Sequence, residues 1–145
     1  MNISIIDGSA YFKGLLLLIR KDRLVTKPEI QLMKRIGKTL GFELEFCDNA
    51  IRDILVNEYI IDIIPEFSSK ALAEKFIKDG LAIAFSDNEL HPSEEEWLRT
   101  AAAKNRIDSS WFQREHDKAA IRRELPPTLE VDDITVQYFS SAGPH

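Results

Sequence analysis

The chain of 145 residues has a single cysteine, Cys47, which excludes an internal disulfide bond and a cysteine-rich zinc site. Glycine is also scarce, with six residues, and neither a Gly-x-Gly-x-x-Gly motif nor a phosphate-binding Gly-x-x-x-x-Gly-Lys-(Ser/Thr) motif occurs. Basic residues number 19 against 24 acidic ones. The resulting net charge of −5 repels a phosphate backbone, so we expect no nucleic-acid partner.

Long hydrophobic runs are absent as well. The longest aliphatic run, residues 15–19, lies between Lys13 and Arg20 and is far shorter than the roughly 20 apolar residues that span a bilayer. Residues 1–7 contain no basic side chain, and no small-residue cleavage site follows the run, so a secretion signal is not indicated. We therefore predict a cytoplasmic protein that does not insert into a membrane.

Apolar residues make up 44% of the chain, and their spacing is mostly helical. Apolar positions three and four apart predict an amphipathic helix over residues 28–40, ended by Gly41. Comparable patterns predict five further helices, over residues 9–21, 45–57, 69–85, 92–104 and 110–124. The segment 9–21 is apolar on nearly every face, as expected of a helix that other helices surround. The predicted fold class is all-α, a single-domain bundle of about six to seven helices.

The two ends of the chain have a different pattern. Apolar and polar residues alternate in 134–138 and in 2–5, which is typical of β-strands. Because a lone strand leaves its backbone unsatisfied, we predict that the two ends pair with each other; a loosely packed tail is the alternative. The apolar run 59–65 does not discriminate strand from helix. We divide the chain into a helical domain, residues 1–125, and a C-terminal extension, residues 126–145.

The chain also contains an internal repeat. When residues 22–29 are aligned with residues 87–94 at a constant offset of 65, Asp22 falls on Asp87 and Glu29 on Glu94. The register continues without a gap for 25 positions and pairs apolar with apolar residues: Val25 with Leu90, Leu32 with Trp97, Met33 with Leu98, Phe42 with Ile107 and Phe46 with Trp111. Each copy is predicted to form a helix, an acidic turn and a second helix, so the bundle would consist of two pseudo-symmetric halves.

The repeated pattern, Asp-x-x-aliphatic-(Ser/Thr)-x-x-Glu before a helix that ends in Leu-Gly, resembles the tellurite-resistance TerB-like family. The resemblance covers roughly residues 10–115. It implies an all-helical fold of two related halves, a role in bacterial stress response or tellurite resistance, and a divalent-cation site made by acidic residues. The residues that match the motif are Asp22, Glu29, Asp87 and Glu94. The chain departs from the family after each Asp, where Arg23 and Asn88 stand in place of the usual Gly.

The same acidic residues have a purely structural interpretation. Thr26-x-x-Glu29 and Ser93-x-x-Glu96 both match the capping box, in which the acid accepts a hydrogen bond at the start of a helix. Acids in a first helical turn also gain a few tenths to about 1 kcal/mol from the helix dipole without any metal. Helix capping and cation binding are therefore two open interpretations of the same residues.

If a cation binds, the second copy is the stronger candidate. Residues 87–96 contain five acids and no Lys or Arg, whereas four basic side chains lie around the first copy: Arg20, Lys21, Arg23 and Lys27. Packing about a two-fold axis would bring the two turns face to face, so that four carboxylates could share one ion. An EF-hand loop from Asp87 is excluded, because its positions 6 and 12 hold Pro92 and Leu98 instead of Gly and Glu.

No catalytic constellation is found in the sequence. Cys47 lies among core residues of the third predicted helix, and no motif brings His91 or His116 beside it, so we interpret it as a small buried hydrophobe. His116 is predicted to be a surface residue. We therefore predict a non-enzymatic TerB-like module with a protein partner and no cofactor other than a divalent cation. The alternative is a pure protein-interaction scaffold with no metal site.

Overall fold

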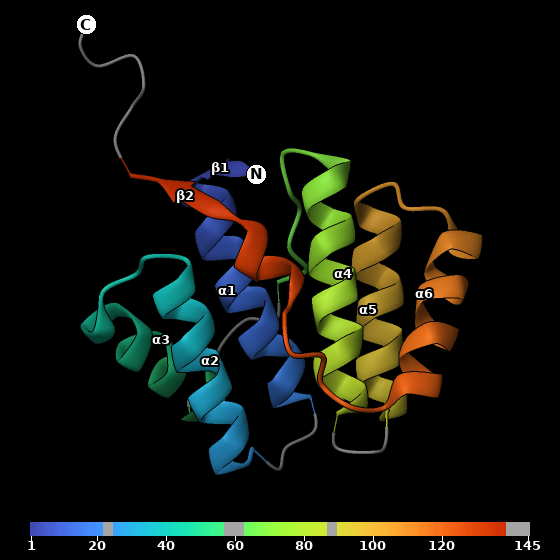
Figure 1. Ribbon diagram of the computed structural model, residues 1–145, viewed down its shortest axis with the longest axis horizontal. Coiled ribbons are helices and arrows are strands. Elements are labelled where there is room, and N and C mark those ends of the chain that lie inside the picture. The colour runs from blue at the N-terminus through green and yellow to red at the C-terminus, as the bar shows by residue number, and fades with distance from the viewer. Residues whose placement is uncertain (22–24, 57–62, 87–89, 139–145) are drawn as a thin grey trace, which may run out of the picture.

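A computed structural model describes residues 1–21, 25–56, 63–86 and 90–138 (Figure 1). These residues form an all-α bundle with a short two-stranded sheet, as the sequence predicts. In chain order the elements are β1 (Asn2–Ser4), α1 (Ile5–Arg20), α2 (Lys27–Thr39), α3 (Leu44–Val56), α4 (Lys70–Phe85), α5 (Pro92–Lys104), α6 (Ser109–Arg122), the 3₁₀ helix η1 (Glu130–Asp133) and β2 (Thr135–Gln137). Among the residues that the structure describes, no helix combines the length and the apolar character that a bilayer crossing requires.

Most helix boundaries follow capping residues that are visible in the sequence. Helix α4 begins after Ser69, whose hydroxyl accepts a hydrogen bond from the Leu72 amide at 3.2 Å. Helix α1 starts at Ile5 rather than at the predicted residue 9, because Ser4 caps it by accepting from the Asp7 amide at 3.1 Å. The strand predicted over residues 2–5 therefore ends at Ser4, and Ile5 belongs to the helix. Of the ambiguous run, residues 59–62 lie outside the described residues, and residues 63–65 form neither helix nor strand.

The predicted repeat is confirmed in the backbone. At the offset of 65, the bounds of α1 coincide with those of α4 and the bounds of α2 with those of α5, while α3 and α6 begin at equivalent residues. Helices α2 and α5 both end in a left-handed turn, at Gly41 with φ of 83° and at Arg106 with φ of 63°. The next amides, of Phe42 and Ile107, close equivalent turns through 2.9 Å bonds to carbonyls five residues earlier. In Figure 1, α1, α2 and α3 form one side of the bundle and α4, α5 and α6 the other.

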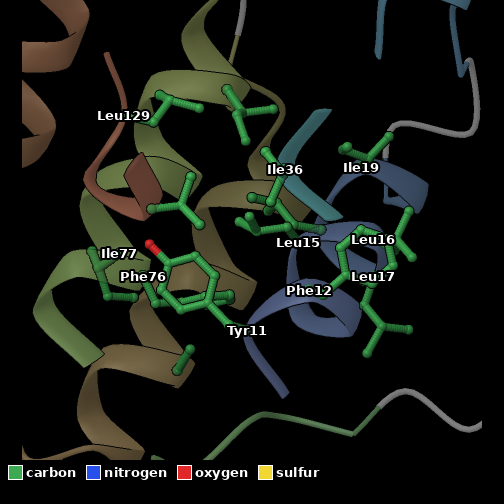
Figure 2. Packing of buried hydrophobic residues seen from close by; sticks show 14 of the residues in the cluster. Tyr11, Phe12, Leu15, Leu16, Leu17, Ile19, Ile36, Phe76, Ile77 and Leu129 are labelled. Carbon is green, nitrogen blue, oxygen red and sulfur yellow. The ribbon is translucent and has the colours of Figure 1, made fainter. Parts of the chain in front are cut away.

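Helix α1 lies between the two halves and contacts α2, α3, α4 and α5. From residue 11 to residue 19 every position except Lys13 is buried, as the composition predicts, whereas Ile5 and Ile6 at the start of the helix are exposed. Figure 2 shows Leu15 beside Ile36 of α2 and the ring of Tyr11 beside Phe76 of α4. The Tyr11 and Phe76 rings meet edge to face, with centroids 5.4 Å apart. Apolar burial around one helix thus joins the two halves.

The two ends of the chain pair with each other, as predicted. Strands β1 and β2 are parallel, with Ile3 opposite Val136, and both of these side chains are buried. Before β2 the chain crosses from one half to the other, since η1 packs against both α2 and α4. Leu129, Val131 and Ile134 are buried along this path. Residues 129–137 of the predicted extension are therefore packed against the helical domain.

The equivalent ends of α2 and α5 allow a matched test. Gly41→Ala places a Cβ at a φ of 83° and 3.2 Å from the Tyr138 ring, so we expect the free energy of unfolding to fall by about 1–2 kcal/mol. Arg106→Gly removes the backbone strain that a side chain causes in the left-handed region. We therefore expect the free energy of unfolding to stay equal or to rise by up to about 1 kcal/mol. Urea denaturation measures both changes. Equal losses in the two variants would contradict this account.

Candidate functional site

The first predicted corner is the start of α2. The Thr26 amide donates to Oε1 of Glu29 at 2.9 Å, and the Glu29 amide donates to the Thr26 hydroxyl at 3.3 Å. These reciprocal bonds form the predicted capping box and hold the Glu29 carboxylate at the beginning of the helix. Asp22, the other predicted ligand of this corner, lies outside the described residues together with Arg23.

The second predicted corner is the start of α5, where the structure corrects the expected cap. The helix begins at Pro92, whose fixed φ suits the first helical position, so His91 is the N-cap residue and Ser93 lies inside the helix. The His91 amide donates to Oε1 of Glu94 at 3.1 Å. The predicted box of Ser93 and Glu96 is therefore wrong, and Glu94 is the acid that accepts the N-cap amide.

The start of α5 adjoins the end of α1, the helix that precedes the first corner. The Ser93 hydroxyl at the start of α5 donates to the Lys21 carbonyl at the end of α1, at 3.4 Å, and α1 contacts α5 directly. Glu94 is 3% exposed, whereas Glu29 is half-buried. Within the described ranges, which leave out both aspartates of the motif, no three His, Cys, Asp or Glu side chains are grouped closely enough to hold a metal ion. The four-carboxylate site stays a prediction, because Asp22 and Asp87 are not among the described residues.

A buried carboxylate that the sequence analysis missed lies on α4. Asp79 is 1% exposed, and both of its oxygens accept hydrogen bonds. The Tyr11 hydroxyl donates to Oδ2 at 2.6 Å, the Glu130 amide to Oδ1 at 2.7 Å and the Val131 amide to Oδ2 at 2.9 Å. Figure 2 shows the Tyr11 hydroxyl at the end of the ring that faces away from α1. One side chain thus ties α1, α4 and η1 together.

The surroundings of Asp79 change its ionisation. Burial raises the pKa of Asp79 from 3.8 to about 6, because the ionised form loses its hydration. The hydrogen bonds from Tyr11, Glu130 and Val131 favour the ionised form and limit the rise. Burial, together with the charge of Asp79, raises the pKa of the Tyr11 hydroxyl well above 10.0, so this hydroxyl keeps its proton and donates it at neutral pH.

A cavity of about 260 Å³ adjoins Asp79 between α4, α6 and the chain that leads to η1. Its charged lining contains three further basic and two further acidic side chains: Lys78, Lys118, Arg122, Glu115 and Glu130. Lys118 Nζ lies 3.1 Å from Glu115, and Lys75 Nζ lies 3.5 Å from Glu130, so ion pairs neutralise part of this lining. Counting Asp79, the two signs balance, and the cavity favours neither an anion nor a cation. We therefore interpret Asp79 as the anchor of η1.

The sequence does contain a signal for Asp79. It lies seven residues after Leu72, three after Phe76 and four before Ile83, on the face that the apolar residues define. An acid is almost never fully buried unless it is paired, so this position indicates a partner inside the core. The partner amides come 51 and 52 residues later in the chain, and no local pattern identifies them.

Two other sequence predictions have different outcomes. Cys47 is buried within the core, as predicted for a small hydrophobe. The predicted surface position of His116 is wrong, because only 17% of its side chain is exposed and its ring meets that of Phe85 with centroids 5.3 Å apart. His116 Nε2 lies 3.3 Å from Oε1 of Glu95, so this side chain connects α6 to α5.

No protein-family model, curated protein or solved structure matches the chain. The candidate sites are the two corners, where Glu29 and Glu94 accept capping amides, and the buried anchor Asp79.

The raised pKa of Asp79 predicts a specific pH dependence of stability. Between about pH 4 and pH 6 the native state binds more protons than the unfolded state, so the free energy of unfolding falls as the pH rises. The loss from this one group is about 3 kcal/mol, since its pKa moves from 3.8 to about 6. Asp79→Asn removes the titration, so we expect the wild type to lose stability relative to this variant by about that amount from pH 4 to pH 7.

Urea denaturation at the two pH values measures this difference. A constant offset between wild type and Asp79→Asn would report only the altered hydrogen bonds and would contradict the raised pKa. Asp117→Asn provides a control of the opposite sign, because the hydrogen bond with His116 lowers the pKa of Asp117. Its contribution to stability is lost, rather than gained, as the pH falls.

Proposed function

We propose that the chain is a non-enzymatic, TerB-like module that binds a divalent cation at its acidic inter-helix corners and acts through a protein partner. By this resemblance, its role lies in a bacterial stress response of the tellurite-resistance type. The observation that carries the proposal is the repetition of one helix–corner–helix unit at an offset of 65. In each copy an acid, Glu29 or Glu94, accepts the N-cap amide of the second helix.

The contact between Ser93 and Lys21 supports a site that both corners share. It joins the end of α1 in the first half to the start of α5 in the second half. Asp22, a residue of the motif, follows Lys21 directly in the sequence. Carboxylate oxygens are the ligands that hard cations such as Mg²⁺ and Ca²⁺ prefer.

A pure protein-interaction scaffold is the second candidate function. The capping bonds favour it, because Oε1 of Glu29 and Oε1 of Glu94 each accept a backbone amide. The helix dipole also stabilises an acid at this position without any ion. In this case the repeated acids maintain the helix starts, and the corners have no ligand.

A cation titration separates the two candidates. A cation at about 100 times its dissociation constant adds about 2.7 kcal/mol of stability, which raises the thermal midpoint of a chain of this size by about 8 °C. We expect one of Mg²⁺, Ca²⁺, Mn²⁺ and Zn²⁺ to produce this shift in the wild-type protein, as measured by differential scanning calorimetry. The absence of a shift with all four cations would leave only the scaffold.

Variants then locate the ion. Glu94→Gln removes the charge but keeps an oxygen for the His91 amide, since Gln also completes a capping box. We expect this variant, and Asp87→Asn, to abolish the shift, and Glu29→Gln to reduce it less, because basic residues surround the first corner. Glu45→Gln, at an exposed acid in the first turn of α3, is the matched control and should keep the full shift. A shift that survives Asp87→Asn and Glu94→Gln would contradict the proposed site.

A further inference from the structure

A second cavity, of about 450 Å³, lies between α2 and α3 in the first half of the chain. Its lining consists of three basic and three apolar residues: Lys34, Arg35, Lys38, Phe42, Leu44 and Cys47. Among the described residues no acid lines it, although the whole chain has a net charge of −5. Glu43 and Glu45, the neighbours of Leu44 in the sequence, are exposed outside the lining. The volume lies within the range of about 300–1,000 Å³ that is typical of small-molecule sites.

The close approach of α2 and α3 fixes the floor of this cavity. A Cβ on Gly37 would lie 2.4 Å from Sγ of Cys47, so only a glycine allows this contact. Phe42 packs against Phe46 with ring centroids 4.9 Å apart, and Tyr138 meets Phe42 edge to face at 6.1 Å. The apolar wall is therefore preorganised, which lowers the entropic cost of binding.

The basic residues at the rim differ in how far they are neutralised. Arg35 donates to both carboxylate oxygens of Asp132, at 2.9 and 3.1 Å. Lys34 Nζ lies 3.8 Å from Asp48, which is the outer limit of an ion pair. The Lys38 ammonium forms no hydrogen bond or ion pair with any residue that the structure describes. It is therefore the charge at the rim that a ligand can use without displacing a partner.

We propose that this cavity binds an amphipathic organic anion, a free medium-chain carboxylate whose chain lies against Phe42 and Leu44 and whose head group pairs with Lys38. The apolar floor matches the chain of such a ligand, and the acid-free basic rim matches its carboxylate. A neutral chain or a small anion would use only one of these two features. The cavity is separate from the acidic corners, so this inference does not depend on the cation.

Decanoate is the probe, titrated by isothermal calorimetry below its critical micelle concentration. Decanol provides the same chain without the charge, and acetate provides the charge without the chain. We expect decanoate to bind about tenfold or more tightly than either control compound, because each lacks one of the two contacts. Equal affinity for decanol or for acetate would overturn the proposal, and so would the absence of decanoate binding.

Two exposed positions test the location. Lys38→Gln removes the unpaired charge, and Leu44→Ser removes the apolar rim, and each is expected to weaken decanoate binding about tenfold. Lys27→Gln, on the same helix outside the lining, is the control for the charge. Ile121→Ser on α6 is the control for the apolar side chain, since Ile121 is 85% exposed and Leu44 68%. Losses in the controls that equal those in the cavity variants would indicate unspecific association and overturn the proposal.

Cys47 provides an independent readout, because it is the only cysteine of the chain and lines the cavity. Burial raises the pKa of its thiol, so its alkylation by uncharged iodoacetamide is slow enough to follow by mass spectrometry. Decanoate at about ten times its dissociation constant should slow this alkylation about tenfold. An unchanged rate in the presence of bound decanoate would place the ligand elsewhere and overturn the proposal.

Discussion

The burial of α1 between the two halves of the bundle is the constraint on which the rest of the structure depends. A helix that is apolar around its whole circumference needs neighbours on all sides, and α1 finds them in both halves of the repeat. Neither three-helix half encloses this helix alone, so the two halves stabilise each other through it. The same packing brings the end of α1 to the start of α5, where Lys21 and Ser93 meet. The proposed cation site is therefore a by-product of how the core is filled.

Buried polar side chains perform a second task, which is to accept backbone amides of the segments between the α-helices. Asp79 accepts the amides at the start of η1. Asp7 accepts the Ser68 amide at 3.1 Å, and Asn105 accepts the Phe67 amide at 2.8 Å, so both fix the chain before α4. Irregular backbone inside a core needs such partners, because an unpaired buried amide is strongly destabilising.

These anchors lie where the repeat breaks. At the offset of 65, Asp79 is equivalent to Gly14 and Asn105 to Leu40. The segments that they hold, residues 65–67 and η1, fall on each other at this offset but differ in structure, because the first is irregular and the second is a 3₁₀ helix. The repeated helices form the bundle, and polar residues that occur in only one copy of the repeat hold the segments that connect these helices.

This division explains which features could be predicted from the sequence. Periodicity and caps predict six helices, and the repeat predicts equivalent turns such as those at Gly41 and Arg106, because these depend on residues close together in the chain. The box of Thr26 and Glu29 was predictable for the same reason. The anchors of Asp79 depend on amides more than 50 residues away, and the corner contact of Ser93 with Lys21 joins residues 72 apart. Such pairs follow only from the packing of complete helices.

The parallel pairing of β1 with β2 also determines how the molecule responds to tension between its ends. Because the strands point in the same direction, the chain enters the sheet at Asn2, at one end of the strands, and leaves it at Gln137, at the other end. Pulling the ends apart slides one strand along the other, so the ladder bonds are loaded in shear and must rupture together instead of unzipping singly. The force therefore acts on this short sheet, in which the buried Ile3 and Val136 lie opposite each other, before it acts on any helix.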